Sequence, residues 1–188
     1  RDIKLTQIWI YPIKSLGGIS LLSAQVMGKG LRYDRRRMLI DETGTALTQR
    51  VHPKMALFKT SISSEQLKIK YDQHELKVGL EEHDQSRPLD VTIWKDRVKA
   101  FEVGSKHSEW FSEMLGIQCK LVFFPEENAR RVDARYQVNN ENVSLADAYP
   151  FMIIGQSSLD DLNSKLKEPV PINRFRPNFV FEGGDPYE

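Results

Sequence analysis

Apolar residues recur at every second position in short runs over roughly the first hundred residues, which is the pattern of half-buried strands. Residues 67–71 and 76–80 alternate in this way on either side of polar turn residues, and they predict a hairpin. A second hairpin is predicted from residues 89–93 and 98–103, with its turn near Lys95 and Asp96. Further strands are expected over residues 3–11, 19–27, 31–41 and 55–62. So many short strands predict a barrel or a sandwich.

Helical periodicity begins only after this β-rich part. A helix is predicted from Ser105, as its N-cap, to Leu115, with Gly116 ending it and with an apolar stripe made by Val103, His107, Trp110, Phe111, Met114 and Leu115. A strand over 117–124 should follow, then a long polar loop over 126–142, a helix over 158–166 and a buried strand at 179–181. The predicted fold class is mainly β with a few helices, a β-rich α+β protein.

Composition removes several classes of function. Lys and Arg number 27 against 26 Asp and Glu, so a net charge of +1 argues against chain-wide attraction to nucleic acid or to an anionic membrane. The apolar runs are much shorter than the roughly 18 residues that a membrane-spanning helix needs. The four histidines are dispersed without metal-ligand spacing, and P-loop, GxGxxG and GxSxG motifs are absent from the sequence.

The single cysteine, Cys119, can form neither an intramolecular disulfide nor a multi-thiolate metal site, which fits a reducing compartment such as the cytoplasm. Cys119 alternates in register with Ile117, Leu121 and Phe123. It is therefore expected to be an inert thiol on the apolar face of its strand.

Two N-terminal segments could hold an anion. Lys14 and Ser15 precede Gly17 and Gly18 at a predicted strand end, where an ammonium, a hydroxyl and backbone N–H groups could meet; a solvated lysine beside a Gly-Gly turn is the alternative. Four arginines, Arg32, Arg35, Arg36 and Arg37, fall within the strand predicted over residues 31–41. At least one of them must reach outward or be desolvated against an acceptor such as Asp34, Asp41 or a phosphate, unless they form a surface ladder paired with local acids.

Two C-terminal segments carry similar chemistry. Arg174, Arg176 and Asn178 surround Pro177 before an apolar strand, and guanidinium and amide groups suit a phosphate and the edge of a heterocycle. These side chains could equally cap the backbone of their own loop. Ser157 and Ser158 open a predicted helix, where free N–H groups favour an anion, although plain helix caps would have the same sequence.

Six segments in this order resemble a known family, the MOSC proteins with an N-terminal MOSC β-barrel domain. The segments are Tyr11-Pro12-Ile13-Lys14-Ser15, Asp34-Arg35, Leu47-Thr48-Gln49-Arg50, Val143-Ser144-Leu145-Ala146-Asp147, Ser157-Ser158-Leu159-Asp160-Asp161-Leu162-Asn163 and Asn173-Arg174-Phe175-Arg176-Pro177-Asn178. The family includes bacterial enzymes that reduce N-hydroxylated bases and the mitochondrial amidoxime-reducing component. The resemblance places an N-terminal MOSC β-barrel domain at residues 1–122 and the first part of a MOSC β-barrel at residues 123–188.

The resemblance also implies a molybdenum cofactor, a phosphorylated pterin (molybdopterin) held between the two domains. The cofactor-binding positions that carry over are Lys14, Ser15, Arg35, Ser157, Ser158, Arg174, Arg176 and Asn178. The implied chemistry is reduction of the N–O bond of a small N-hydroxylated or N-oxygenated substrate. The electrons would come from a partner with an iron–sulfur, flavin or cytochrome centre.

One departure limits what this chain is expected to do alone. In the family the molybdenum-ligating cysteine lies after the Arg-Pro-Asn strand, so it is expected downstream of Glu188, and Cys119 does not match its place. We therefore expect a fragment that is inactive alone and has an unpaired strand edge; an anchor or transit segment before Arg1 would not be visible. The alternatives are a molybdenum cofactor or sulfur carrier without turnover, and an anion-binding β domain with a degenerate site. The wider family also includes cofactor sulfurases, whose pyridoxal phosphate domain has no counterpart in this sequence.

Overall fold

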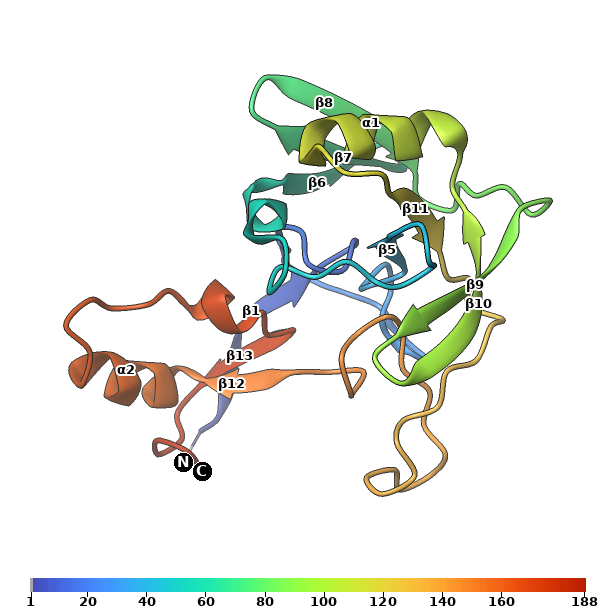
Figure 1. The fold of residues 1–188 in the computed structure, drawn as a ribbon. Coiled ribbons are helices and arrows are strands. Elements are labelled where there is room, and N and C mark those ends of the chain that lie inside the picture. Colours follow the sequence, from blue (N-terminus) through green and yellow to red (C-terminus); the bar gives the residue numbers. More distant parts are fainter. Residues whose placement is uncertain (1) are drawn as a thin grey trace.

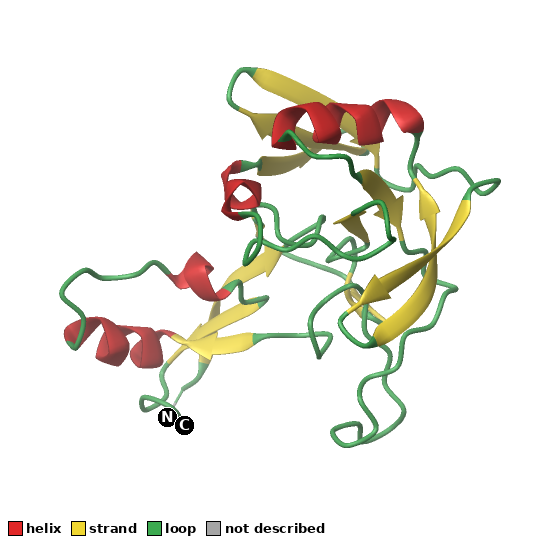
Figure 2. Cartoon of the chain, in the orientation of Figure 1, coloured by secondary structure: helices red, strands yellow, loops and turns green. Residues whose placement is uncertain are grey.

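The structure is a computed structural model that describes residues 2–188. It contains many short strands, two α-helices and two short 3-10 helices (Figure 2). One four-stranded sheet has the order β12 (Ile153–Gly155), β13 (Phe179–Glu182), β1 (Lys4–Ile10), β2 (Ile19–Leu21). A second has the order β5 (Arg37–Ile40), β11 (Lys120–Phe123), β10 (Asp96–Glu102), β9 (Pro88–Ile93). The predicted fold class, mainly β with a few helices, is confirmed.

Two smaller sheets complete the β structure. The strands β6 (Lys59–Ser63), β7 (Gln66–Tyr71) and β8 (His74–Gly79) form a three-stranded meander, and β3 (Val26–Met27) pairs with β4 (Gly30–Leu31). The helix α1 (Ser105–Leu115) lies beside β8 and β11, whereas α2 (Gln156–Ser164) lies beside β12 and β13 at the opposite end of the molecule (Figure 1).

The main core forms between the meander, α1, and one face of β5 and β11. Leu67, Ile69 and Val78 from the meander pack with Phe111 from α1 and Leu121 from β11, and all five are fully buried. Cys119 is buried in the same cluster, as its alternation predicted. A second apolar cluster covers the other face of β5 and β11 and includes residues of β9 and β10. Apolar residues on both faces therefore fix the second four-stranded sheet in the middle of the molecule.

Both predicted hairpins are confirmed, with the second turn at Trp94 and Lys95, and the first helix spans the predicted residues. The strand predicted over residues 31–41 is wrong in its middle. Tyr33 and Arg35 have φ angles of 68° and 47°, so the chain turns there and only β4 and β5 remain extended. The strand predicted over 19–27 is likewise broken into β2 and β3.

The helix ends also differ from the prediction. Gly104, not Ser105, is the N-cap residue of α1, and Gly155 is the N-cap residue of α2, so Ser157 and Ser158 lie inside the first turn. The segment 55–62 contains a 3-10 helix, η1 (Pro53–Leu57), before β6. A second 3-10 helix, η2 (Ile172–Phe175), leads toward β13. The loop predicted over 126–142 is confirmed, since it holds neither a helix nor a named strand.

The strand β13 joins the two ends of the chain. It pairs antiparallel with β1 and parallel with β12, so it is central in its sheet, and β12 and β2 form the sheet edges. The pairing with β1 brings the segment before β13 beside the residues that follow β1. This sheet therefore places the Arg176 loop beside the Lys14 turn, although 162 residues separate them in sequence.

Candidate functional site

A cavity of about 420 Å³ opens where six separate chain segments meet. Its walls come from the turn after β1, the turn before β5, the loop after β5, the tip of the β9–β10 hairpin, the loop before β12, and the η2–β13 connection. The lining residues are Lys14, Ser15, Arg35, Thr48, Gln49, Arg50, Trp94, Ala146, Asp147, Ala148, Tyr149, Phe151, Met152, Arg174, Phe175, Arg176 and Asn178. Five of these residues are lysine or arginine and one is aspartate, so the lining has a net positive charge.

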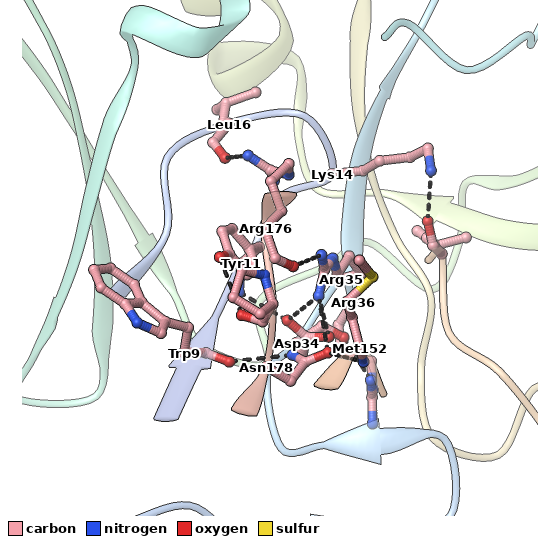
Figure 3. A network of polar contacts seen from close by, with 12 residues as sticks. Trp9, Tyr11, Lys14, Leu16, Asp34, Arg35, Arg36, Met152, Arg176 and Asn178 are labelled. Atoms are coloured by element: carbon pink, nitrogen blue, oxygen red, sulfur yellow. Dashed lines mark hydrogen bonds and ion pairs between the residues drawn. The ribbon is translucent and has the colours of Figure 1, made fainter. Parts of the chain in front are cut away.

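Asp34 organises the base of this cavity (Figure 3). The Asp34 carboxylate accepts the Tyr11 backbone N–H at 2.8 Å and both oxygens accept from Arg35 Nη1, at 3.0 and 2.8 Å. Arg35 Nη2 also donates to the Arg176 carbonyl at 3.2 Å. Since Asp34 is buried, the ion pair fixes the αL turn at Arg35 and aims the guanidinium toward the Arg176 loop.

The Tyr11 ring lies against both guanidiniums. Cζ of Arg35 and Cζ of Arg176 are each 4.3 Å from the centroid of the ring. The Tyr11 hydroxyl donates to the Pro177 carbonyl at 3.1 Å, which ties the turn after β1 to the loop before β13. Burial raises the pKa of Tyr11 to about 12, although the two arginines oppose this shift. Tyr11 is therefore a neutral phenol that supports two cations by cation–π contact.

Asn178 holds the backbone of the site together. Its Oδ1 accepts the Met152 N–H at 3.1 Å, and its Nδ2 donates to the Trp9 carbonyl at 3.1 Å. Both ends of the buried amide are thus engaged by the protein. Asn178 directly precedes β13, and its side chain links this strand to β1 through Trp9 and to the segment before β12 through Met152.

Lys14 is buried and donates to the Leu145 carbonyl at 3.1 Å and to Asp147 Oδ1 at 2.5 Å. Burial favours a higher pKa for the Asp147 carboxyl, but the charge of Lys14 and its hydrogen bond outweigh this effect and hold the pKa below its ordinary value. Asp147 also accepts the indole N–H of Trp94 at 3.1 Å. The ammonium therefore lies at the cavity wall, next to an ionised carboxylate.

The guanidinium of Arg176 has one nitrogen that donates a hydrogen bond and one that has no partner among the described residues. Its Nη1 donates to the Leu16 carbonyl at 2.7 Å, but its buried Nη2 has no hydrogen-bond partner within residues 2–188. Burial, together with the neighbouring charge of Arg35, lowers the pKa of Arg176 to about 10. Arg176 lies with Lys14, Arg35, Arg50 and Arg174 in the cavity wall, and this cationic lining suits an anionic ligand.

Two family models match this chain. Residues 2–118 match the model of the MOSC N-terminal beta barrel domain, and residues 140–188 match the MOSC domain. The first match covers more than half of the chain. The chain belongs to the MOSC N-terminal beta barrel family.

Curated relatives fall into two groups. The MOSC chain is 30% identical over 190 residues to mitochondrial amidoxime-reducing component 1 of Mus musculus, which covers 95% of this chain and 55% of that protein. It is 30% identical over 205 residues to the molybdenum cofactor sulfurase of Oryza sativa subsp. japonica, covering 99% of this chain and 25% of that protein. The chain thus spans about half the length of the first relative and a quarter of the second. No helix within residues 2–188 is long and apolar enough to cross a membrane.

The structure of the MOSC chain brings six of the eight predicted cofactor-binding residues to one cavity: Lys14, Ser15, Arg35, Arg174, Arg176 and Asn178. Ser157 and Ser158 do not line it. They lie in the first turn of α2, where the Ser158 hydroxyl oxygen accepts the Tyr187 N–H at 2.9 Å. The anion-binding role of all eight residues stays a prediction.

Several lining residues of the MOSC chain were not among the predicted site residues. Thr48, Gln49 and Arg50 reach the cavity, and Gln49 Nε2 donates to the Ser15 carbonyl at 2.6 Å. Trp94 and Asp147 form another part of the wall. Thr48–Arg50 and Asp147 belong to segments that carried the family resemblance, which was the available signal, whereas Trp94 had none.

The other arginines of the predicted strand have structural partners. Arg36 donates to Glu126 and to the Asp34 carbonyl, and the fully buried Arg37 donates to the carbonyls of Gly79 and Leu80. They are desolvated against acceptors, so a surface ladder is wrong for these two positions. Within residues 2–188 there is no cluster of three or more His, Cys, Asp or Glu side chains that could hold a metal ion.

Proposed function

We propose that the cavity binds the phosphorylated pterin of the molybdenum cofactor. The observation that carries this proposal is the convergence of six predicted residues, from three separate chain segments, on one cationic cavity. Guanidinium and ammonium groups suit phosphate, and their partial desolvation strengthens each contact. A volume of about 420 Å³ also lies within the usual range for small-molecule sites.

The residues that would hold the cofactor differ in what they can offer. Arg176, Arg174 and Lys14 supply positive charge, and the hydroxyl of Ser15 supplies a donor. Asn178 has its amide engaged with Met152 and Trp9, so its contribution is to fix the loop that presents Arg176. Lys14 can keep its bond to the Leu145 carbonyl while it turns toward a phosphate.

The parent protein, on this proposal, is an oxidoreductase that reduces N-hydroxylated or N-oxygenated substrates. Relatives named as amidoxime-reducing components support this reaction class. When bound, the molybdenum would supply two-electron reduction of the N–O bond, and a partner with an iron–sulfur, flavin or cytochrome centre would supply the electrons. We place the thiolate ligand of the metal outside residues 2–188, because Cys119 is buried in the main core and does not line the cavity.

The proposed cofactor site is tested by pterin retention. The parent protein and variants of it would be purified from a molybdenum-replete host, and the oxidised pterin would be measured by fluorescence. Arg174→Gln and Arg176→Gln should each reduce retained pterin about tenfold or more, since each removes a charge from the cavity. Arg174 is exposed, so its replacement tests binding without disturbing the core.

Arg97→Gln is the matched control. Its guanidinium is exposed and lies 3.6 Å from Asp90, and it does not line the cavity. Retention by Arg97→Gln and loss by the two cavity variants would support the proposal. Equal retention by all three folded variants would contradict the site assignment.

A carrier function is the second candidate. The resemblance to molybdenum cofactor sulfurases, over nearly the whole of this chain, favours it. A carrier would bind the cofactor, or a sulfur atom, and release it to a recipient without turnover. Transfer of pterin to an apo-molybdoenzyme, without reduction of hydroxylamine or amidoxime by the loaded parent protein, would favour the carrier over the reductase.

A further inference from the structure

A second cavity, of about 660 Å³, adjoins the first one at Trp94. The two cavities share three lining residues: Trp94, Asp147 and Ala148. The second cavity is otherwise lined by the β9–β10 turn and the loop before β12, with Lys95, Asp96, Arg130, Arg131, Asp133, Arg135, Tyr136 and Val143. Trp94 therefore belongs to the partition between the proposed cofactor cavity and a second space.

The backbone holds Trp94 in an unusual conformation. Trp94 is the first residue of the two-residue loop between β9 and β10, and its φ angle is 54°. Glycine is usual where such a loop needs a positive φ at its first position, because a side chain is strained there. The side chain is also 49% exposed. A strained and exposed aromatic residue gains little for folding, which directs attention to a binding role.

Contacts with Asp147, Arg50 and Lys14 orient the indole, and Lys14 Nζ lies 6.0 Å from the centroid of its ring. The indole Nε1–H donates to Asp147, which also accepts from Lys14, and the Cζ of Arg50 lies 5.3 Å from the ring centroid. Arg50 lines the first cavity and not the second, so its guanidinium covers the ring from the first side. The indole is thus fixed in place, and because Trp94 lines both cavities, part of its side chain borders the second one.

The second cavity has two aromatic lining residues, Trp94 and Tyr136, and its four cations nearly balance its three carboxylates. The Tyr136 side chain is 58% exposed there, and its ring centroid is 6.4 Å from that of Tyr149, which lines the first cavity. Asp133 accepts from Lys95 at 2.5 Å and from Arg135 at 2.9 Å.

The remaining cations of this cavity also have partners. Arg130 donates to Asp96 at 2.8 Å, and Arg131 donates to the Asn140 carbonyl. With its cations engaged in this way, the cavity favours an uncharged ligand over an anion.

From this arrangement we infer that the second cavity binds a flat, uncharged aromatic group stacked on Trp94. Trp94 is then a specificity-determining residue that positions this group next to the proposed cofactor cavity. The inference of a ring-binding site depends only on the cavity and on the position of Trp94. Its assignment to the organic part of the substrate rests on the proposed function.

The test compares two probes that differ in the shape of one ring. Benzamide carries a flat ring, whereas cyclohexanecarboxamide carries the same amide on a puckered ring of similar size. Each would be titrated into the isotope-labelled protein, and the indole N–H resonances of its three tryptophans followed by NMR. We expect the Trp94 resonance to move and benzamide to bind about fivefold more tightly, as stacking on an aromatic face predicts.

Two variants identify the role of the ring. Trp94→Phe keeps an aromatic face and should retain the preference for benzamide. Trp94→Asn tolerates the positive φ but removes the ring, and it should abolish the preference. Equal affinity for both probes in the wild type, or an unchanged preference in folded Trp94→Asn, would overturn the inference.

Pterin content separates this inference from the proposed function. Because the titration uses no cofactor, ring binding and pterin retention are independent readouts. A benzamide preference that depends on Trp94, in a protein that retains no pterin, would support the ring site and refute its assignment to the substrate. Absence of the preference in a wild-type protein that retains pterin would refute the ring site alone.

Discussion

Replacing Asp34 by asparagine should destabilise the fold strongly, because Asp34 neutralises Arg35 inside the protein. The carboxylate side chain is 1% exposed and that of Arg35 is 11% exposed, and the two form an ion pair at 2.8 Å. Removing one partner of a buried ion pair costs about 3–5 kcal/mol. Asparagine keeps an acceptor for the Tyr11 N–H, so we expect a loss near the lower bound, about 3 kcal/mol of unfolding free energy.

Asp34→Ala should cost more than Asp34→Asn. It also leaves the Tyr11 N–H without its acceptor, which adds about 1–3 kcal/mol. Urea unfolding followed by circular dichroism measures both changes. Asp90→Asn is the control, since Asp90 is exposed and lies 3.6 Å from Arg97, and exposed pairs of this kind contribute about 0.2–1 kcal/mol. If Asp34→Asn and Asp90→Asn unfold at the same urea concentration, the assignment of Asp34 as the buried counter-charge of this site is wrong.

Three further predictions concern packing, reactivity and pH. Gly18→Ala would place a Cβ 2.5 Å from the Tyr11 ring and should lower the free energy of unfolding by about 2 kcal/mol, whereas Gly28→Ala meets no atom within 4 Å and should lower it much less; thermal melts would decide. Cys119 is buried and burial raises the pKa of its thiol, so a thiol reagent should label it only after denaturation, and rapid labelling of the folded protein would contradict its placement. Burial lowers the pKa of Lys29 to about 8 from 10.5, so between these pH values the unfolded chain binds a proton that the folded chain does not. The stability of the wild type relative to Lys29→Met should therefore rise from pH 8 to pH 10.5 in urea titrations, and a fall would refute the burial of a destabilised ammonium.

The hairpins could be predicted from sequence because each is a local event. Leu67 pairs with Val78 and Ile69 with Leu76, so apolar residues meet across a short turn on one face of the meander. The main helix was predictable for a similar reason, since Phe111 and Met114 recur on one side of it. Alternation or periodicity within a short stretch was sufficient in both cases.

The turn between β4 and β5 could not be predicted in this way. Its conformation depends on Asp34, whose carboxylate bonds to the Tyr11 backbone 23 residues earlier. Arg37 likewise looks like a surface residue in sequence, yet it is fully buried because the carbonyls of Gly79 and Leu80 accept its protons. Local patterns do not reveal acceptors that only the tertiary fold supplies.

Most residues of the candidate site could be predicted from the sequence, but the way in which the fold arranges them around the cavity could not. Lys14, Ser15, Arg35 and Arg176 were identified by their chemistry and by family resemblance, and they do line one cavity. Trp94 was missed, because its place at the cavity depends on where the β9–β10 hairpin ends relative to the loop before β12. Ser157 and Ser158 carried the same signal as the other residues and lie elsewhere.

Cofactor content is the most direct test of the central claim that this cationic cavity holds a molybdopterin. The parent protein that contains this chain would be purified from a molybdenum-replete host that makes active molybdoenzymes, then oxidised, and the released pterin would be quantified by its fluorescence. The proposed function predicts pterin close to one equivalent per chain in the wild type and a loss of about tenfold or more in Arg176→Gln. A folded wild-type protein without pterin would contradict the claim, and the cationic lining of the cavity would then require another anion as its ligand.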